Sequence, residues 1–406
     1  MMGDAQPVGY RSLLKLAVPR RLALASIPAD FADWLDYAAV VGLLVFVWGE
    51  GPFVLALFAL ALTLPYVAVG PLLAMVVDRT PLARVLVLSN LGRGLATLAL
   101  VFAPSTAVVL VLVFLRSSID SAFTPARQAA IQASTPFGLL TTANGLHQAI
   151  NQTSKIAGPA LGGLLLTVMP AQSVFAINAV LSLVATAVVF GIALPAPVKR
   201  EAGGSFWGEL LAGVAEFKRS NLLMTALVFS SIAYFSFFLY DALIALLVED
   251  FGYGATAFGF SIAASGGGGL IGALLAGRVT GQNPIASMSL GAVVAGVTAA
   301  GLALAAIFGV VLPIVLFLCG MAFAAGSTAF MLVPYRTIIQ AEAPPDRIAR
   351  VFAAGEAVTM AVMLSAPFIG SFIASVYGTG AAFLVGGVLL IALGVVTGAR
   401  QLVRSG

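Results

Sequence analysis

The sequence predicts an all-α membrane protein with twelve transmembrane helices in two pseudo-symmetric six-helix bundles, and three observations support this fold class. Apolar residues make up 61% of the 406 residues and charged residues only 9%, which is more apolar than a water-soluble core requires. Apolar windows of about 20 residues, the helix length that crosses ~30 Å of hydrocarbon, recur along the whole chain. Short motifs of the first half also return in the second half at a nearly fixed offset.

The apolar windows give the expected helices in order along the chain. We place them near residues 22–47, 52–77, 85–103, 106–128, 140–168, 172–194, 221–248, 256–277, 286–307, 310–334, 350–375 and 379–399.

The repeat divides the chain into two halves. Pro125 returns as Pro334 and Pro159 returns as Pro367, at offsets of 209 and 208 residues. Parallel repeats of this kind are typical of transporters whose binding site lies at the interface of the repeats. We therefore expect an N-terminal six-helix bundle, a cytoplasmic linker and a C-terminal six-helix bundle, at residues 1–194, 195–220 and 221–406.

The linker is predicted to carry an amphipathic helix. Ser205 can cap it, and its apolar side chains share one face. These side chains belong to Phe206, Leu210, Leu211, Val214 and Phe217. We expect this helix to lie on the cytoplasmic leaflet, with a soluble linker helix as the alternative.

Positive charge defines the expected orientation. Seventeen of the 20 Lys and Arg residues can be placed on one side of the membrane, whereas the turns on the other side carry only the acids Glu50, Glu249 and Asp250. Because cytoplasmic loops retain Lys and Arg, both termini are expected to be cytoplasmic. The basic balance thus reports topology, and nucleic-acid binding is not predicted. No removable signal peptide is expected, and the single cysteine, Cys319, is interpreted as a packing residue.

The turn after the second window contains Asp78, Arg79 and Arg84. It resembles the signature loop between helices 2 and 3 of the major facilitator superfamily. The resemblance implies a latch that closes the cytoplasmic side by pairing with charges on helices 4 and 11, for which Arg127 and Glu356 are the matching positions. Ala74 stands where the family usually has glycine.

Two further stretches carry the resemblance. The run Gly158-Pro159-Ala160-Leu161-Gly162-Gly163 is similar to the antiporter motif found mainly in drug and metabolite exporters of this family. Its small residues and proline predict a packing surface and a hinge. The segments 125–130 and 350–352 resemble the branch that contains macrolide, multidrug and siderophore exporters. This branch implies a monomer in the bacterial cytoplasmic (inner) membrane.

Charged side chains inside the windows are the functional candidates, because each costs roughly 2.5 to 3.5 kcal/mol at the centre of a helix unless it faces a partner or water. They are Asp30, Asp33, Asp36, Arg93, Arg116, Asp120, Lys155, Asp241 and Glu356. Arg93 has no obvious partner in the sequence.

The first window contains three carboxylates at spacings of three, namely Asp30, Asp33 and Asp36. Neighbouring carboxylates in low dielectric disfavour full ionisation, so at least one should hold a proton near neutral pH. Asp33 stands 208 residues before Asp241, and the two acids are expected to face each other across the cavity. For Asp30, helix packing or water contact on the cytoplasmic side is an equal alternative.

The fourth window places Arg116, Asp120 and Arg127 on one stripe, since they are four and seven residues apart. Arg116 matches a family position that the resemblance implicates in proton coupling. A pair of Arg116 with Asp120 predicts a switch in which a proton on the carboxylate frees the guanidinium. A self-neutralised structural pair is the alternative.

The fifth window presents His147, Asn151 and Lys155 on one face. Such a stripe must face protein or water, because lipid offers no hydrogen bonds. His147 is interpreted as a packing residue in preference to a titrating one. Two interpretations of Lys155 stay open, binding of an anionic substrate group and neutralisation of an acid of the first helix. Tyr234 and Tyr240, in the seventh window, are candidates for an apolar cavity wall.

The glycine run 266–269 lacks the context of a phosphate-binding loop, and neither a catalytic arrangement nor a metal-ligand cluster is recognisable. We therefore expect a transporter without cofactor. The leading hypothesis is proton-coupled efflux of lipophilic cationic or zwitterionic compounds by rocker-switch alternating access. The alternatives are export of an anionic metabolite, siderophore or lipid-like molecule, export of divalent metal, and a non-transporting membrane sensor.

Overall fold

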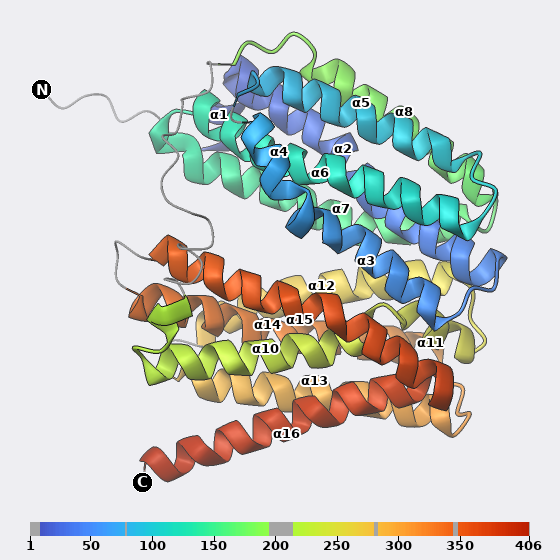
Figure 1. Cartoon of the computed structure of the whole chain (residues 1–406), viewed down its shortest axis with the longest axis vertical. Coiled ribbons are helices and arrows are strands. Elements are labelled where there is room, and N and C mark those ends of the chain that lie inside the picture. The colour runs from blue at the N-terminus through green and yellow to red at the C-terminus, as the bar shows by residue number, and fades with distance from the viewer. Residues whose placement is uncertain (1–8, 78, 195–213, 280–282, 344–347, 406) are drawn as a thin grey trace, which may run out of the picture. The chain divides into compact units, whose positions relative to one another are not determined.

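The computed structural model describes residues 9–77, 79–194, 214–279, 283–343 and 348–405 (Figure 1). Within these ranges the regular structure is helical, and each of the twelve expected windows coincides with one helix or with two consecutive ones. Nine of the described helices are long and apolar enough to cross a membrane. The all-α prediction is confirmed.

The chain divides into two compact units, the first formed by Met1–Trp48 with Leu60–Glu201 and the second by Gly49–Ala59 with Ala202–Gly406. The helices up to the linker are α1 (Tyr10–Lys15), α2 (Ala17–Gly42), η1 (Leu43–Val47), α3 (Pro52–Ala68), α4 (Gly70–Val77), α5 (Leu82–Leu100), α6 (Thr106–Ser134), η2 (Phe137–Leu139), α7 (Leu140–Leu165) and α8 (Ala171–Val189). In the first unit α2 packs against both α7 and α8, and α5 packs against α6 and α8.

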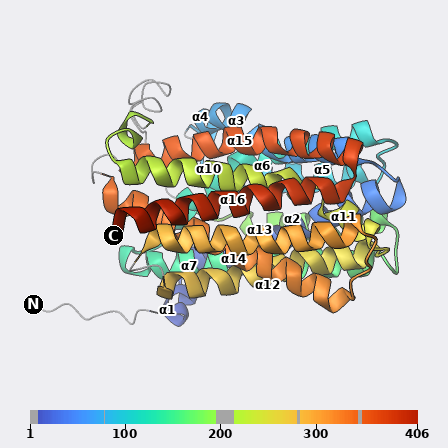
Figure 2. The same ribbon diagram turned by 90° about the horizontal axis from the view of Figure 1, so that it is seen from below.

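The helices after the linker belong to the second unit. They are α10 (Asn221–Asp241), α11 (Ile244–Asp250), α12 (Ala255–Val279), α13 (Pro284–Ile307), α14 (Ile314–Glu342), α15 (Ile348–Tyr377) and α16 (Thr379–Ser405). Here α16 lies between α10 and α13, and α12 packs on α14 (Figure 2). Most of the predicted linker helix, residues 205–213, lies outside the described part, but Phe217 is buried in the core of this unit.

Two expected helices are interrupted. The second window contains α3 and α4, and Pro71, which lacks an N–H, follows the break. The seventh was expected to be continuous over 221–248, but α10 ends at Asp241 and α11 begins at Ile244. At this break the N–H of Leu243 donates to the Tyr240 carbonyl (2.8 Å). The Leu239 carbonyl oxygen instead lies so near α15 that a Cβ built on Gly370 would be 1.7 Å from it.

Glycines allow helix backbones in the second unit to approach closely. A Cβ on Gly268 of α12 would lie 1.9 Å from the carbonyl oxygen of Ala322, and one on Gly272 would lie 2.2 Å from that of Gly326. Both neighbours belong to α14. The glycine run of α12 thus serves close packing, and only glycine fits at these two positions.

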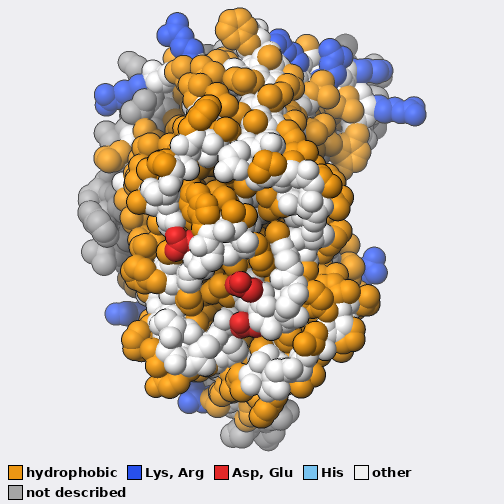
Figure 3. Space-filling model, turned by 90° about the vertical axis from the view of Figure 1, so that its right-hand side faces the viewer, with side chains coloured by type: hydrophobic (Ala, Val, Ile, Leu, Met, Phe, Trp, Pro, Cys, Tyr) orange, Lys and Arg blue, Asp and Glu red, His pale blue; other side chains and the backbone are white. Residues whose placement is uncertain are grey.

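Charge is unevenly distributed on the surface. The face shown in Figure 3 carries a few acidic side chains among hydrophobic ones. Glu249 and Asp250, at the end of α11, are exposed. This pattern agrees with an exoplasmic assignment of that side, which remains a prediction.

Candidate functional site

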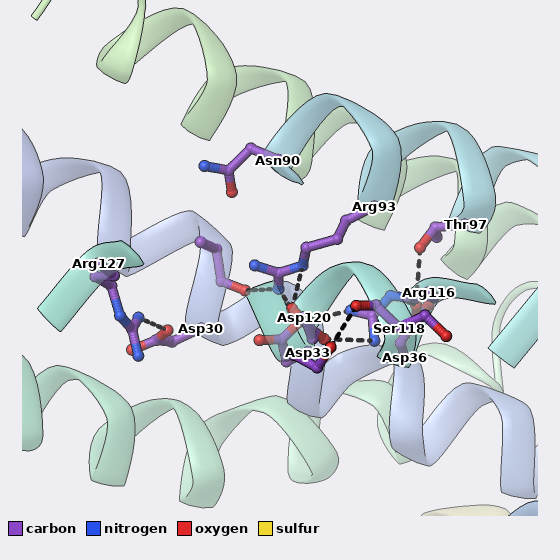
Figure 4. A network of polar contacts seen from close by, with 12 residues as sticks. Asp30, Asp33, Asp36, Asn90, Arg93, Thr97, Arg116, Ser118, Asp120 and Arg127 are labelled. Atoms are coloured by element: carbon purple, nitrogen blue, oxygen red, sulfur yellow. Dashed lines mark hydrogen bonds and ion pairs between the residues drawn. The ribbon is translucent and has the colours of Figure 1, made fainter. Parts of the chain in front are cut away.

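The three carboxylates of the first window lie on α2 and face the interior of the first unit. Asp30 and Asp36 are buried, whereas the side chain of Asp33 keeps 31% of its surface exposed. Spacings of three place them on one side of the helix. The guanidinium groups they meet come from α5 and α6, so the site is assembled from three helices (Figure 4).

Asp33 is shared by two arginines. Its Oδ1 accepts hydrogen bonds from Arg93 of α5 and from Nη2 of Arg116 on α6, the latter at 2.5 Å. A carboxylate between two guanidiniums offsets their mutual repulsion, and its hydrogen bonds to them are charge-assisted, which makes them roughly twice as strong as neutral ones. Asp33 is therefore the centre of the arrangement.

Arg93 is the charged residue for which the sequence showed no partner. Its Nε lies 2.9 Å from Oδ1 of Asp120, and its Nη2 donates to Asp33 and, at 3.3 Å, to the Ala29 carbonyl. Only 1% of the Arg93 side chain is exposed. A buried guanidinium requires paired carboxylates, and this cost was the signal that could have identified it.

Arg116 was predicted to pair along its own helix with Asp120, and the structure has this pair, although it is the longest ion pair of Arg116. The distance from Nη1 of Arg116 to Oδ2 of Asp120 is 3.9 Å, whereas Arg116 Nε lies 3.1 Å from Oδ2 of Asp36 and Asp33 lies nearer still. Asp36 also accepts a hydrogen bond from Thr97 at 2.9 Å. The ion pairs of Arg116 with α2 are thus shorter than its local pair within α6.

Asp30 and Arg127 form a second, separate pair (Figure 4). Asp30 was a candidate proton-coupling residue, with helix packing or water contact as the alternative, and Arg127 was expected to belong to the cytoplasmic latch. In the structure Arg127 donates to Asp30 within the first unit. Phe123 lies between the two sets of charges, its ring centroid 4.8 Å from Arg93 and 5.2 Å from Arg127.

We call Asp33, Asp36, Arg93, Arg116 and Asp120 the central ion cluster. It contains three carboxylates and two guanidiniums, so its ionised form carries one negative charge. A net charge in low dielectric is costly, and one proton or one bound cation removes it. The cluster has the composition of a cation-binding site that can also hold a proton.

The polar stripe of α7 divides into two parts. The hydroxyl of buried Ser26 donates to the Leu22 carbonyl (3.0 Å), so the Nδ1–H of His147 donates to Ser26 Oγ, also at 3.0 Å. Packing was the expected role of His147, and its surroundings agree. Asn151 and Lys155 are half-buried, and Nζ of Lys155 lies 5.3 Å from the ring centroid of Trp34.

The glycines of the antiporter-like motif face α2. A Cβ on Gly158 would lie 2.7 Å from Cβ of Trp34, and one on Gly162 would lie 3.0 Å from Cβ of Ala38. Pro159 and Gly163 are buried within the same helix. The motif is a packing surface between α7 and α2, and its role as a hinge stays a prediction.

The remaining predicted residues are dispersed. Asp78 lies outside the described residues, and Arg79, Arg84 and Glu356 are exposed, so the latch stays a prediction.

The second unit carries the other cavity candidates on α10. Asp241 is its last residue, Tyr240 is buried with its ring 4.6 Å from that of Phe383, and Tyr234 is stacked on Phe238. The expected approach of Asp33 to Asp241 remains untested.

Comparison with known proteins identifies the fold. The sequence profile of the family described as "Major Facilitator Superfamily" matches residues 22–355. Among solved structures, nucleoside transporter NupG superposes with a TM-score of 0.76 at 14% identity, covering 95% of this chain and 99% of that chain. A bacterial homologue of the iron transporter ferroportin gives a TM-score of 0.68 at 17% identity, covering 93% and 98%. These two likenesses show the fold alone.

Sequence relatives include transporters of the same family. An "Uncharacterized MFS-type transporter YfiS" of Bacillus subtilis (strain 168) is 27% identical over 374 residues, covering 91% of this chain and 89% of that protein. "Macrolide efflux protein A" of Enterococcus faecalis is 26% identical over 223 residues, covering 53% of this chain and 69% of that protein. The chain is thus a multi-pass membrane transporter of twelve-helix architecture and belongs to the major facilitator superfamily.

Proposed function

We propose that this transporter exports lipophilic cationic or zwitterionic compounds in exchange for protons. The observation that carries the proposal is the central ion cluster, in which three carboxylates face two guanidiniums. Among its carboxylates Asp33 is the most exposed, at 31% of the side chain against 5% for Asp36 and 12% for Asp120. Asp33 is therefore where a proton or a substrate cation reaches the cluster.

The charge balance explains the direction of coupling. A cation bound beside Asp33 stabilises the ionised cluster, whereas a proton on one of its carboxylates removes the excess charge and with it the attraction for the cation. Proton and cation thus compete for one negative charge. Competition of this kind gives antiport when the two six-helix halves alternate access by a rocker-switch movement.

The relatives support efflux. Macrolide efflux protein A is named for efflux, and the antiporter-like motif of α7 is present in this chain. The proposed setting is the bacterial cytoplasmic membrane, with both termini in the cytoplasm, and the protein is proposed to act as a monomer with the latch formed by Asp78, Arg79 and Arg84.

The alternatives are weaker. Export of an anionic compound was favoured by Arg116 and Lys155, but Arg116 is engaged by carboxylates, which leaves Lys155 alone. Export of divalent metal needs a set of oxygen ligands, and the described residues contain no group of three or more His, Cys, Asp or Glu side chains that could hold a metal ion.

The test is efflux from proteoliposomes with an imposed pH gradient. The probe is the ethyl ester of rhodamine B, a lipophilic cation without a carboxylate. We expect flux to follow the proton gradient in the wild type and to lose this dependence in Asp33→Asn and Asp120→Asn. Glu249→Gln, which removes an exposed acid, is the matched control and should behave as wild type. Flux that ignores the gradient, or that follows it equally in both Asn variants, contradicts proton coupling.

A further inference from the structure

Lys155 is a membrane-embedded cation whose surroundings differ from those of the neighbouring arginines. It lies on α7, ten residues before the end of that helix, and its side chain is half-buried. Arg93, Arg116 and Arg127 each pair with carboxylates of α2 or α6. Among the described residues Lys155 makes no ion pair, and its ammonium lies over the ring of Trp34, 5.3 Å from the centroid.

A cation–π contact alone is a modest partner for a lysine inside a membrane. It contributes roughly 0.5 to 2 kcal/mol, less than the cost of placing the charge at mid-membrane. No acid of the first helix makes up the difference, since the ion pairs that Asp30, Asp33 and Asp36 make are with arginines and none of them is with Lys155. The sequence left two roles for Lys155 open, and the ion pairs of the described carboxylates weaken the neutralising role.

Trp34 fixes the place of the ammonium relative to the central ion cluster. It follows Asp33 directly on α2, and its Cβ is held against Gly158, where a glycine Cβ would lie 2.7 Å away. Gly158 is three residues after Lys155, so the two share a face of α7. The edge of Tyr37 packs on Trp34 at a centroid distance of 6.2 Å. The aromatic surface of Trp34 thus has a positive group, Lys155, over its ring and a negative group, Asp33, as its neighbour in the chain.

We propose that Lys155 and Trp34 form an anion-binding subsite, and that the preferred substrates are lipophilic zwitterions. The cationic group of the substrate lies toward Asp33, its apolar body packs on Trp34, and its carboxylate binds Lys155. This inference rests on the proposed function, because it specifies the substrate class of the same site. It adds a preference for an anionic group, which proton exchange alone does not require.

The experiment compares rhodamine B, which carries a carboxylate and a delocalised cation, with its ethyl ester, which carries only the cation. Binding of both dyes is measured by fluorescence polarisation with the full-length protein in nanodiscs. Wild type should bind rhodamine B about tenfold more tightly than the ester, the range of one charge-assisted contact. Lys155→Met should remove this preference, so that the two dyes bind with about equal affinity, and Lys155→Arg should retain it.

Two controls separate the contributions. Lys218→Met removes an exposed lysine and should keep the preference. Trp34→Leu should lower the affinity for both dyes, because both are expected to pack on the same aromatic surface. Retained binding of the ester by Lys155→Met also shows that this variant is folded.

The inference is overturned if wild type binds the two dyes equally, if it binds neither, or if Lys155→Met lowers the affinity for both dyes by the same factor. None of these results decides proton coupling, which is read from the response of flux to a pH gradient. Conversely, a clear preference for rhodamine B with flux that ignores the gradient would leave the subsite standing and contradict the proposed antiport.

Discussion

The two units share a helical plan but differ in what fills their interiors. In the first unit, buried carboxylates and guanidiniums of α2, α5 and α6 form the central ion cluster and a separate pair. In the described part of the second unit the buried ionisable acid is Glu216, and close backbone contacts at glycines dominate the packing of α12 on α14 and of α13 on α16. The repeat therefore preserves a scaffold, and the chemistry lies mainly in one of its copies.

The contrast follows from what each kind of packing allows. Glycine contacts bring backbones together without polar side chains, so they give a close-packed frame with no titratable group. An ion cluster needs side chains of several helices at fixed distances, and its energy changes whenever one proton is added. A frame in one unit and a titratable cluster in the other fit the proposed proton-driven transport.

The largest expected effect comes from removing a buried charge of the central ion cluster. Arg93→Leu removes a guanidinium that is 1% exposed and leaves Asp33 and Asp120 with Arg116 alone. Breaking a buried pair costs about 3–5 kcal/mol, so thermal unfolding in detergent should begin at a clearly lower temperature. Arg84→Leu, at an exposed arginine, should unfold like the wild type. Equal midpoints for the two variants would show that the cluster contributes little to stability.

A smaller effect is expected from disturbing a glycine contact between two helices of the second unit. Gly268→Ala places a methyl group where the Ala322 carbonyl oxygen would be only 1.9 Å away, so α12 and α14 must separate. Overpacking of this kind costs about 1–3 kcal/mol. Gly267→Ala is the matched control, since a Cβ there meets nothing within 4 Å. If the second unit is only a frame, Gly268→Ala lowers the unfolding temperature and leaves the pH dependence of flux unaltered. A shifted pH dependence would contradict the division of roles.

The smallest effect is expected from removing a hydroxyl group that donates a hydrogen bond to the central ion cluster. Thr97→Val removes the hydroxyl that donates to Asp36 at 2.9 Å and should cost about 1 kcal/mol. Thr186→Val is its control, because the Thr186 hydroxyl donates only to the backbone of its own helix, at Ser182. Thermal unfolding of both variants measures the difference. No difference would place Thr97 outside the functional cluster.

The sequence predicted the helices and the charged candidates well, because both follow from the cost of placing polar groups in hydrocarbon. Each apolar window contains a helix. Five of the nine charged candidates meet in the central ion cluster, and a sixth, Asp30, pairs separately with Arg127. The family was also predicted from short motifs and is confirmed by the match over residues 22–355.

The ion pairs between helices were not predictable from spacing. Four residues separate Arg116 from Asp120, and this local pair is present at 3.9 Å, but the pairs of Arg116 with Asp33 and Asp36 of α2 are shorter. The break of the seventh helix has the same kind of origin. Neither proline nor glycine occurs between α10 and α11, and the close approach of Gly370 comes from a distant part of the chain.

The central claim is that the central ion cluster of the first unit carries one excess negative charge, and that a proton and a substrate cation neutralise it in turn. Its most direct test is the proton release that accompanies binding of rhodamine B ethyl ester, measured in weakly buffered detergent solution. Wild type should release up to about one proton per dye bound, because cation binding favours the ionised cluster. Asp33→Asn leaves two carboxylates and two guanidiniums, so it should release none. No release from the wild type, or the same release from Asp33→Asn, would contradict the claim.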